Sequence, residues 1–421
     1  MHRAARVRQV IVVVSALVAV AVGLRTVGAV RLRAAGRAFV REYGVPEAPG
    51  SSCQRSGGAA GWLRAGALGL LLEREEKTLA DALLTPGGAR WTQAQRDAAR
   101  RLVREHAPAL ELLHRAVGKP HRGFGVRGPS ADVRFGLPLF PLMDASRVLA
   151  VEARLAFLDG EEERGRLALA TMAVLATALE RECFATAQGV GLIAERWLLG
   201  VAAERVAAGP FAATDLSQSI RGAVPAEDLR QAWRRRLKES VEADTWTDLE
   251  MRGTLRSRVL APLLSPFWRA RQHTTAVRLA ATLDVPVDDA AHLEADSWAW
   301  WSPAAAQEGA LLRLSQKYRA ALAARQLAAV ALDLLDLAAD TGSYPERLET
   351  PGGAAGSDPF TGQPLAYGAV PGGGVRIEIP GGADRWRELF AEGGAPPPFA
   401  WRLPPPRPGR APVAAAPPHS S

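Results

Sequence analysis

The sequence predicts a mainly α-helical protein with an N-terminal transmembrane helix, a helical-hairpin body, and a long helix capped by a small β-hairpin. Ala, Leu, Arg and Glu dominate the middle of the 421-residue chain, whereas aromatic and β-branched residues are sparse there, which favours helix over sheet. Apolar residues also recur at spacings of three and four over long stretches, as one face of a helix requires. A chain of this length can form two or three domains with sizeable cores.

The positive net charge of the chain lies in its first segment. Residues 1–41 hold eight arginines and no acidic residue. Of the 52 basic residues, 44 therefore remain against 44 acidic ones, so the rest of the chain is neutral. This distribution argues against nucleic-acid binding. A basic segment beside an apolar run is instead a signal of membrane topology and of contact with lipid headgroups.

The apolar run Val10–Leu24 predicts a single membrane anchor. It lies between Arg8 and Arg25 and is shorter than the ~20 residues that cross the hydrocarbon core, but Arg25 can snorkel and Val27–Val30 extend the apolar face. The alternative is a signal peptide cleaved after Val27-Gly28-Ala29. The flanking arginines favour the uncleaved anchor. We expect a single-pass protein of the bacterial inner membrane, with a short inner N-terminus and a periplasmic body.

Residues 42–60 predict a linker rich in Gly, Pro and Ser, and residues 61–301 predict a helical body. Two of its helices meet at Asp159-Gly160, and this hairpin is the unit of tetratricopeptide-like stacks, although no 34-residue period is present. The helices predicted in the body are Leu63–Leu84, Thr92–Val117, Ser146–Leu158, Glu161–Leu179 and Phe184–Ala207.

The best candidates for metal ligands are Asp288, His292 and Asp296. Their spacing of four residues would place them on one helix face, and their carboxylate and imidazole groups can bind a transition metal. Charged residues at this spacing more often form a solvated helix face, and we prefer that interpretation. Cys53 and Cys183 are the only cysteines and lie in no zinc-binding pattern. They form either one disulfide or two separate thiols.

Residues 302–392 predict a long helix followed by a β-hairpin. Ser302 suits the N-cap and Pro303 the first helical position, and Thr341-Gly342 ends the helix. The proline makes Tyr344-Pro345 extended. The turn that follows and its two strands comprise Asp358-Pro359, Gly362, Leu365–Tyr367 and Val375–Ile379. The Pro- and Ala-rich residues 393–421 predict a disordered tail.

The region after the long helix resembles the C-terminal half of the major pseudopilins of type II secretion. In those proteins a long helix runs into a GxYP turn, and a DP(W/F)GxPY turn starts a small sheet. The residues that carry the resemblance are Gly342, Tyr344, Pro345, Asp358, Pro359, Gly362 and Tyr367. From about Val103 to Ile379 the chain is similar to a set of large, uncharacterised, membrane-anchored bacterial proteins that pair a helical body with such an end.

The resemblance implies an architecture and no reaction. In it, the motif residues fold the chain back on the long helix. Two pseudopilin features are not evident in this sequence: the prepilin peptidase site Gly-Phe-Thr-Leu-x-Glu before the apolar run, and the acidic calcium loop after Ile379.

The sequence contains no HExxH, GxSxG, P-loop or SxxK motif and no paired Cys/His spacing. We therefore predict no catalytic residue and no cofactor. The function that we predict is that of a noncatalytic, membrane-anchored envelope protein, a scaffold or interaction module for an unknown protein partner. The first alternative is a component of a secretion or pilus-like machine, and the second is a hydrolase.

Overall fold

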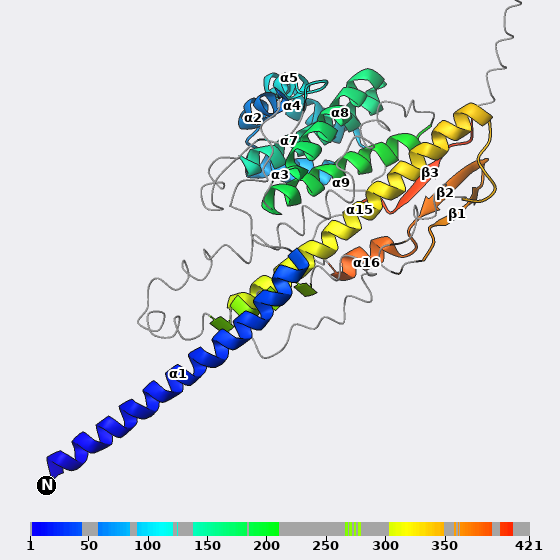
Figure 1. Ribbon diagram of the computed structural model, residues 1–421. Helices are drawn as coiled ribbons and strands as arrows, with labels where there is room; N and C mark the ends of the chain where they lie inside the picture. Colours follow the sequence, from blue (N-terminus) through cyan, green and yellow to red (C-terminus); the bar gives the residue numbers. More distant parts are fainter. Residues whose placement is uncertain are drawn as a thin grey trace, which may run out of the picture. The chain divides into compact units, whose positions relative to one another are not determined.

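The computed structural model confirms the mainly α-helical fold class, with 73% of the described residues in helices and a small antiparallel sheet near the C-terminal end (Figure 1). Only the backbone is described for residues 2–12, 14, 17, 43, 185–186, 303–316 and 388–389. The described residues are 2–43, 58–84, 91–120, 124, 138–182, 185–209, 266–267, 269–271, 273–274, 277–278, 303–348, 358, 361, 363–389 and 396–406.

The chain divides into two compact units. The first unit comprises Met1–Ala48, Arg230–Val285 and Asp289–Ser315. The second unit comprises Pro49–Leu229, Pro286–Asp288 and Gln316–Ser421. Helix α15 (Pro303–Thr341) contributes to both, because its residues up to Ser315 belong to the first unit and the others to the second.

The first unit contains helix α1 (His2–Tyr43), which is about 60 Å long at a rise of 1.5 Å per residue. Its Gly28 lies so close to Phe267 that a Cβ at this position would be 2.8 Å from the ring. Phe39 stacks on His273 with ring centroids 4.8 Å apart. These contacts pack the second half of α1 against helical residues of the 266–278 region. Across the described stretches, no helix combines the length and the apolarity needed to cross a membrane.

The second unit begins with four short helices where the sequence predicts two longer ones. They are α2 (Gly58–Leu68), α3 (Arg74–Leu83), α4 (Gln93–Glu105) and α5 (Ala107–His114). Pro108 lies in the first turn of α5 and cannot continue a helix from α4, so the predicted helix Thr92–Val117 breaks at His106. Thr92 starts α4 with a capping box. The Thr92 hydroxyl accepts a hydrogen bond from the Gln95 backbone N–H, and the Gln95 side-chain oxygen accepts one from the Thr92 backbone N–H.

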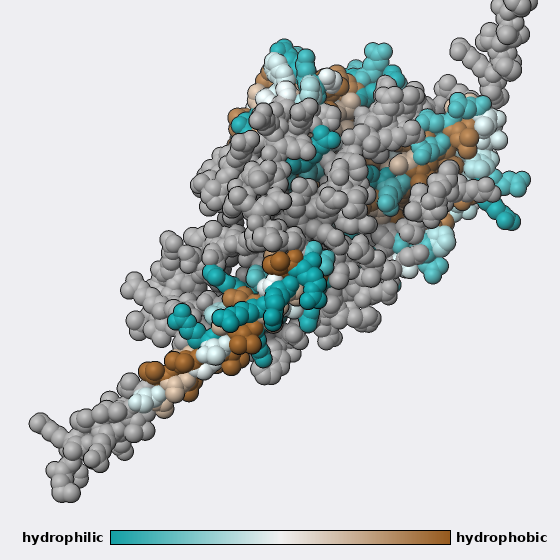
Figure 2. All heavy atoms as spheres, viewed as in Figure 1, coloured by the Kyte–Doolittle hydropathy of each residue, from teal (hydrophilic) through white to brown (hydrophobic). Residues whose placement is uncertain are grey.

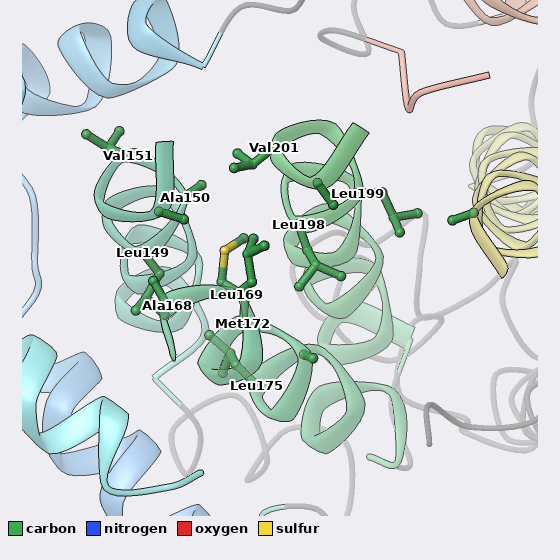
Figure 3. Close-up of a cluster of buried hydrophobic side chains, with 14 of the residues drawn as sticks. Leu149, Ala150, Val151, Ala168, Leu169, Met172, Leu175, Leu198, Leu199 and Val201 are labelled. Carbon is green, nitrogen blue, oxygen red and sulfur yellow. The ribbon is translucent and has the colours of Figure 1, made fainter. Parts of the chain in front are cut away.

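The predicted helical hairpin is present as α7 (Leu139–Asp159) and α8 (Glu162–Glu180), and α9 (Ala185–Ala207) packs on both. Gly160 ends α7 with φ of +80°, which only glycine adopts without strain. Helix α7 begins seven residues before the predicted Ser146. Figure 3 shows that side chains from all three helices meet in one cluster, which forms the centre of the core.

The sheet has three antiparallel strands in the order β1 (Ala366–Val370), β2 (Gly374–Glu378) and β3 (Ala400–Leu403). The first two strands are the predicted hairpin, and the short helix α16 (Gly382–Leu389), which was not predicted, follows β2. The prediction of a disordered tail over 393–421 is wrong for residues 396–406. Phe399, Trp401 and Leu403 alternate with small or charged residues, and all three are buried as β3 pairs with β2 and packs against α9. Residues 407–421 lie outside the described residues.

Candidate functional site

The metal candidates Asp288, His292 and Asp296 lie outside the described residues, as do Cys53 and Cys183. Within the described ranges, no three His, Cys, Asp or Glu side chains are placed to hold a metal ion.

The predicted turn residues are placed at the end of α15 and the start of the sheet. Gly342 has φ of +77° and its N–H donates to the carbonyl of Ala338 at 2.9 Å, which closes the last turn of α15. Asp358 is almost fully buried, and its N–H donates to the carbonyl of Gln363 at 2.7 Å. Its carboxylate accepts from the hydroxyl of Thr361 at 2.5 Å. Pro359 and Gly362 lie outside the described residues.

Two tyrosines connect these turns. The Tyr367 hydroxyl on β1 donates to the carbonyl of Pro345 at 2.8 Å, and the Tyr344 hydroxyl donates to the carbonyl of Pro404 at 2.8 Å. Burial raises the pKa of Tyr344 to about 12, and Tyr367 adds to the shift. Burial also raises the pKa of Tyr367. Both phenols therefore stay neutral donors at ordinary pH, and each of them joins its turn to a backbone carbonyl distant in the chain.

The most unusual chemistry lies in an ionic cluster buried between helices, formed by Glu180 of α8, Glu195 of α9 and Arg325 of α15. The three residues are 1%, 5% and 8% exposed. The Arg325 guanidinium donates to both oxygens of Glu195, from Nε to Oε1 and from Nη2 to Oε2, the latter at 2.7 Å. Nη2 also donates to Glu180 Oε1. Such a bidentate fork is the strong form of the arginine–carboxylate pair. We call these three residues the Glu–Arg–Glu cluster.

Burial and the neighbouring charges shift the pKa values of this cluster. It raises the pKa of Glu180 to about 8, with the Arg325 charge opposing the shift and the Glu195 charge adding to it. Burial on its own would lower the pKa of Arg325, but the two carboxylates raise it further than burial lowers it. Arg325 is therefore the cation of the cluster, and Glu180 is the carboxyl group whose pKa burial raises.

A second buried acid, Asp144 of α7, binds to residues of α3 and of the segment before it. Its carboxylate is fully buried and accepts from Arg147 Nη1 at 2.8 Å, from Lys77 Nζ at 3.2 Å and from the Leu72 N–H at 3.3 Å. Arg147 also donates to Asp81 of α3 at 2.9 Å. A buried carboxylate with three donors is well satisfied, so this cluster fixes α3 and the segment before it on α7.

A third network has the outline of a catalytic triad. His114 Nδ1 lies 2.8 Å from the Thr171 hydroxyl, and Nε2 lies 3.1 Å from Glu152 Oε2, which Arg164 supports from α8. A nucleophile, a base and an orienting carboxylate follow the same order. Thr171, however, is fully buried, and its hydroxyl donates to the carbonyl of Leu167 at 2.8 Å. No substrate can reach it in this conformation, so the network joins α5, α7 and α8.

The pattern of the sequence did not identify the Glu–Arg–Glu cluster, although one signal was present. Tyr318 and Leu322 belong to a row of apolar residues at helical spacing on α15, and the charged Arg325 comes three residues after Leu322. Its two partners are 145 and 130 residues away in the chain, which no local pattern reveals.

Comparison with protein-family models, curated proteins and solved structures gave no match.

Proposed function

We propose that this protein is a noncatalytic, membrane-anchored envelope protein whose helical second unit is a scaffold or interaction module for a protein partner. The observation that carries the proposal is the apolar surface of α1. Large apolar side chains along this helix are 42% to 60% exposed, and Figure 2 shows brown, hydrophobic surface along α1. They are Val13, Val18, Val20, Val22, Leu24, Val27 and Val30. Exposed apolar surface on this scale marks contact with a membrane or another protein.

The charges beside this surface favour lipid as the contact. Arg8 and Arg25 bracket the apolar run, and Arg31, Arg33 and Arg37 follow it. Basic residues at the ends of an apolar helix bind lipid headgroups and set topology. We propose one pass through a bacterial inner membrane, with a periplasmic body. The apolar run Val10–Leu24 is itself too short to cross, so the proposal requires that Arg25 snorkels and that Val27–Val30 lengthen the apolar face.

The second unit supports a scaffold because its buried charges join helices. Asp144 connects α7 to α3, Glu152 connects α7 to α5 and α8, and Arg325 connects α15 to α8 and α9. Buried charged groups with satisfied partners can favour one specific packing of the helices over others.

Membrane attachment is tested on the full chain produced in a bacterial host. We expect the protein in the membrane fraction, resistant to alkaline carbonate, with its intact N-terminus detected by mass spectrometry. Val18→Arg combined with Val22→Arg should move it to the soluble fraction. Val40→Arg is the matched control, because Val40 is also an exposed valine of α1 but lies outside the apolar run. A wild-type protein that is soluble, or one that begins after Ala29, would contradict the anchor.

The scaffold role is tested by crosslinking the tagged full-length protein in cells and identifying captured proteins against an unrelated single-pass protein with the same tag. We expect one or a few envelope proteins that are enriched reproducibly. A protein that crosslinks to nothing above this control would contradict the scaffold role while leaving the anchor intact.

One arrangement supports the alternative, a component of a secretion or pilus-like machine. A long helix ends at Gly342, and Tyr344, Asp358 and Tyr367 then lead into a small antiparallel sheet, in the order that the pseudopilin resemblance implies. Captured partners that belong to a secretion machine would favour this alternative.

A further inference from the structure

The Glu–Arg–Glu cluster is unbalanced in charge. Arg325 supplies one positive charge to two buried carboxylates. If both carboxylates were ionised, the cluster would hold an uncompensated negative charge in a region where each member is less than a tenth exposed. An isolated buried charge is so costly that the group usually neutralises instead.

The two carboxylates differ in the hydrogen bonds that they accept. Glu195 receives the fork of Arg325 on both of its oxygens, whereas Glu180 receives one guanidinium nitrogen on Oε1. Glu180 Oε2 is buried and has no hydrogen-bond partner among the described residues. An ionised carboxylate needs donors on both oxygens, so Glu180 is the worse site for the second negative charge.

The groups that face Glu180 come from the two helices packed against it. They are Arg325 of α15 and Glu195 of α9, and the phenol of Tyr318 on α15 acts on Arg325. Gln188 of α9 is neutral and donates to the Glu180 backbone carbonyl at 3.5 Å and to that of Glu182 at 3.0 Å.

We infer that Glu180 is a buried proton-binding site that controls how firmly α15 is held on α8 and α9. With the proton bound, the cluster is neutral and closed. When Glu180 is ionised, the closed cluster carries a net negative charge, and an opened arrangement in which water reaches Glu180 is favoured. All three residues of the cluster belong to the second unit.

The sign of the pH effect follows from proton binding. Burial raises the pKa of Glu180 to about 8 in the closed state, whereas an opened, hydrated Glu180 has an ordinary pKa. Between these two values the closed state holds one more proton than the open state. The closed arrangement of α15 on α8 and α9 is therefore most stable at acidic pH. Its stability falls as the pH rises toward about 8 and changes no further above that pH.

The pH dependence of α15 packing on α8 and α9 can be tested by hydrogen exchange of the full-length protein in detergent, measured by mass spectrometry from pH 5.5 to 9. After correction for the intrinsic rate, protection of residues 318–332 should fall by up to tenfold per pH unit, as one linked proton allows, and level off above pH 8. Glu180→Gln should remove the slope, and Glu195→Gln should do the same, because Arg325 then pairs with an ionised Glu180.

The matched control is Glu162→Gln, on the same helix α8, where Glu162 is a more exposed acid paired with Arg205. This variant should keep the wild-type slope. A wild-type profile that does not change with pH would overturn the inference without any variant. A slope that persists in both Glu180→Gln and Glu195→Gln would also overturn it. None of these outcomes depends on the membrane or scaffold role, which localisation and crosslinking test separately.

Discussion

The hydroxyl of Tyr344 donates a 2.8 Å hydrogen bond to the carbonyl of Pro404, a residue 60 positions further along the chain. Tyr344 follows the end of α15, and Pro404 follows strand β3. The bond therefore joins the end of the long helix to the last strand of the sheet. It explains why a strand forms in proline-rich sequence: Trp401 and Leu403 are fully buried on the inner face, and the tyrosine holds the residue after them.

Replacing Tyr344 tests how much its hydrogen bond to Pro404 contributes to stability. Tyr344→Phe keeps the ring and removes the donor, so we expect the free energy of unfolding to fall by about 1 kcal/mol, the usual net value of one hydrogen bond. Urea unfolding followed by circular dichroism measures this loss. An unchanged midpoint of urea unfolding would mean that this hydrogen bond does not stabilise the protein.

The same residue predicts a pH dependence at the alkaline end. Burial raises the pKa of Tyr344 above its ordinary value of 10, to about 12, so the folded protein holds the neutral phenol more tightly than the unfolded chain does. The stability that it contributes is present below pH 10 and is lost as the pH rises toward 12. Tyr344→Phe should reduce this loss in thermal unfolding measured from pH 9 to 11.5. A loss of equal size in the variant would assign it to other groups.

Strand β3 should be essential to the sheet. Trp401 is fully buried, so Trp401→Ala should cost about 3–5 kcal/mol through lost burial and the cavity left behind. The indole Nε1 is buried and has no hydrogen-bond partner among the described residues, so Trp401→Phe removes no bond and should cost clearly less. Urea unfolding of both variants measures the difference, and equal losses would mean that the volume of the indole is not the reason.

The sequence predicted the elements whose signals are local. The end of α15 at Gly342 and the hairpin of β1 and β2 depend on turn chemistry within a few residues, and both are present. Strand β3 was missed because six prolines within residues 396–406 outweighed the short alternation at Phe399, Trp401 and Leu403. The Glu–Arg–Glu cluster was missed for a different reason. Its members are unremarkable on their own helices, and only the tertiary packing of α8, α9 and α15 gives them each other as partners.

Two glycines of α1 provide a matched pair of tests for the first unit. A Cβ at Gly28 would lie 2.8 Å from the ring of Phe267, whereas a Cβ at Gly23 meets nothing within 4 Å. Gly28→Leu should therefore cost about 1–3 kcal/mol by overpacking. Gly23→Leu should stabilise the helix by up to about 1 kcal/mol, because leucine is the better helix former.

Limited proteolysis of the full-length protein in detergent measures this difference, with cleavage in the 266–278 region as the readout. We expect faster cleavage in Gly28→Leu and no acceleration in Gly23→Leu. Equal rates in the two variants would show that α1 does not pack on this region in solution.

The largest single effect should come from Arg325. Arg325→Met removes the only positive charge of the Glu–Arg–Glu cluster and leaves two carboxylates that are 1% and 5% exposed. Removing one partner from a buried ionic cluster costs about 3–5 kcal/mol, because the remaining charge is left uncompensated. Urea unfolding at pH 7 should show this loss.

The triple variant Arg325→Met, Glu180→Gln and Glu195→Gln separates the cost of uncompensated charge from the cost of lost packing. It contains no ionised group in the cluster, so much of the stability lost in Arg325→Met should return. If the triple variant were as unstable as Arg325→Met, the loss would come from the shape of the arginine side chain, which packs between α8 and α9, and the buried charges would not be its cause. Recovery in the triple variant would instead show that Arg325 is needed there chiefly because two acids are buried beside it.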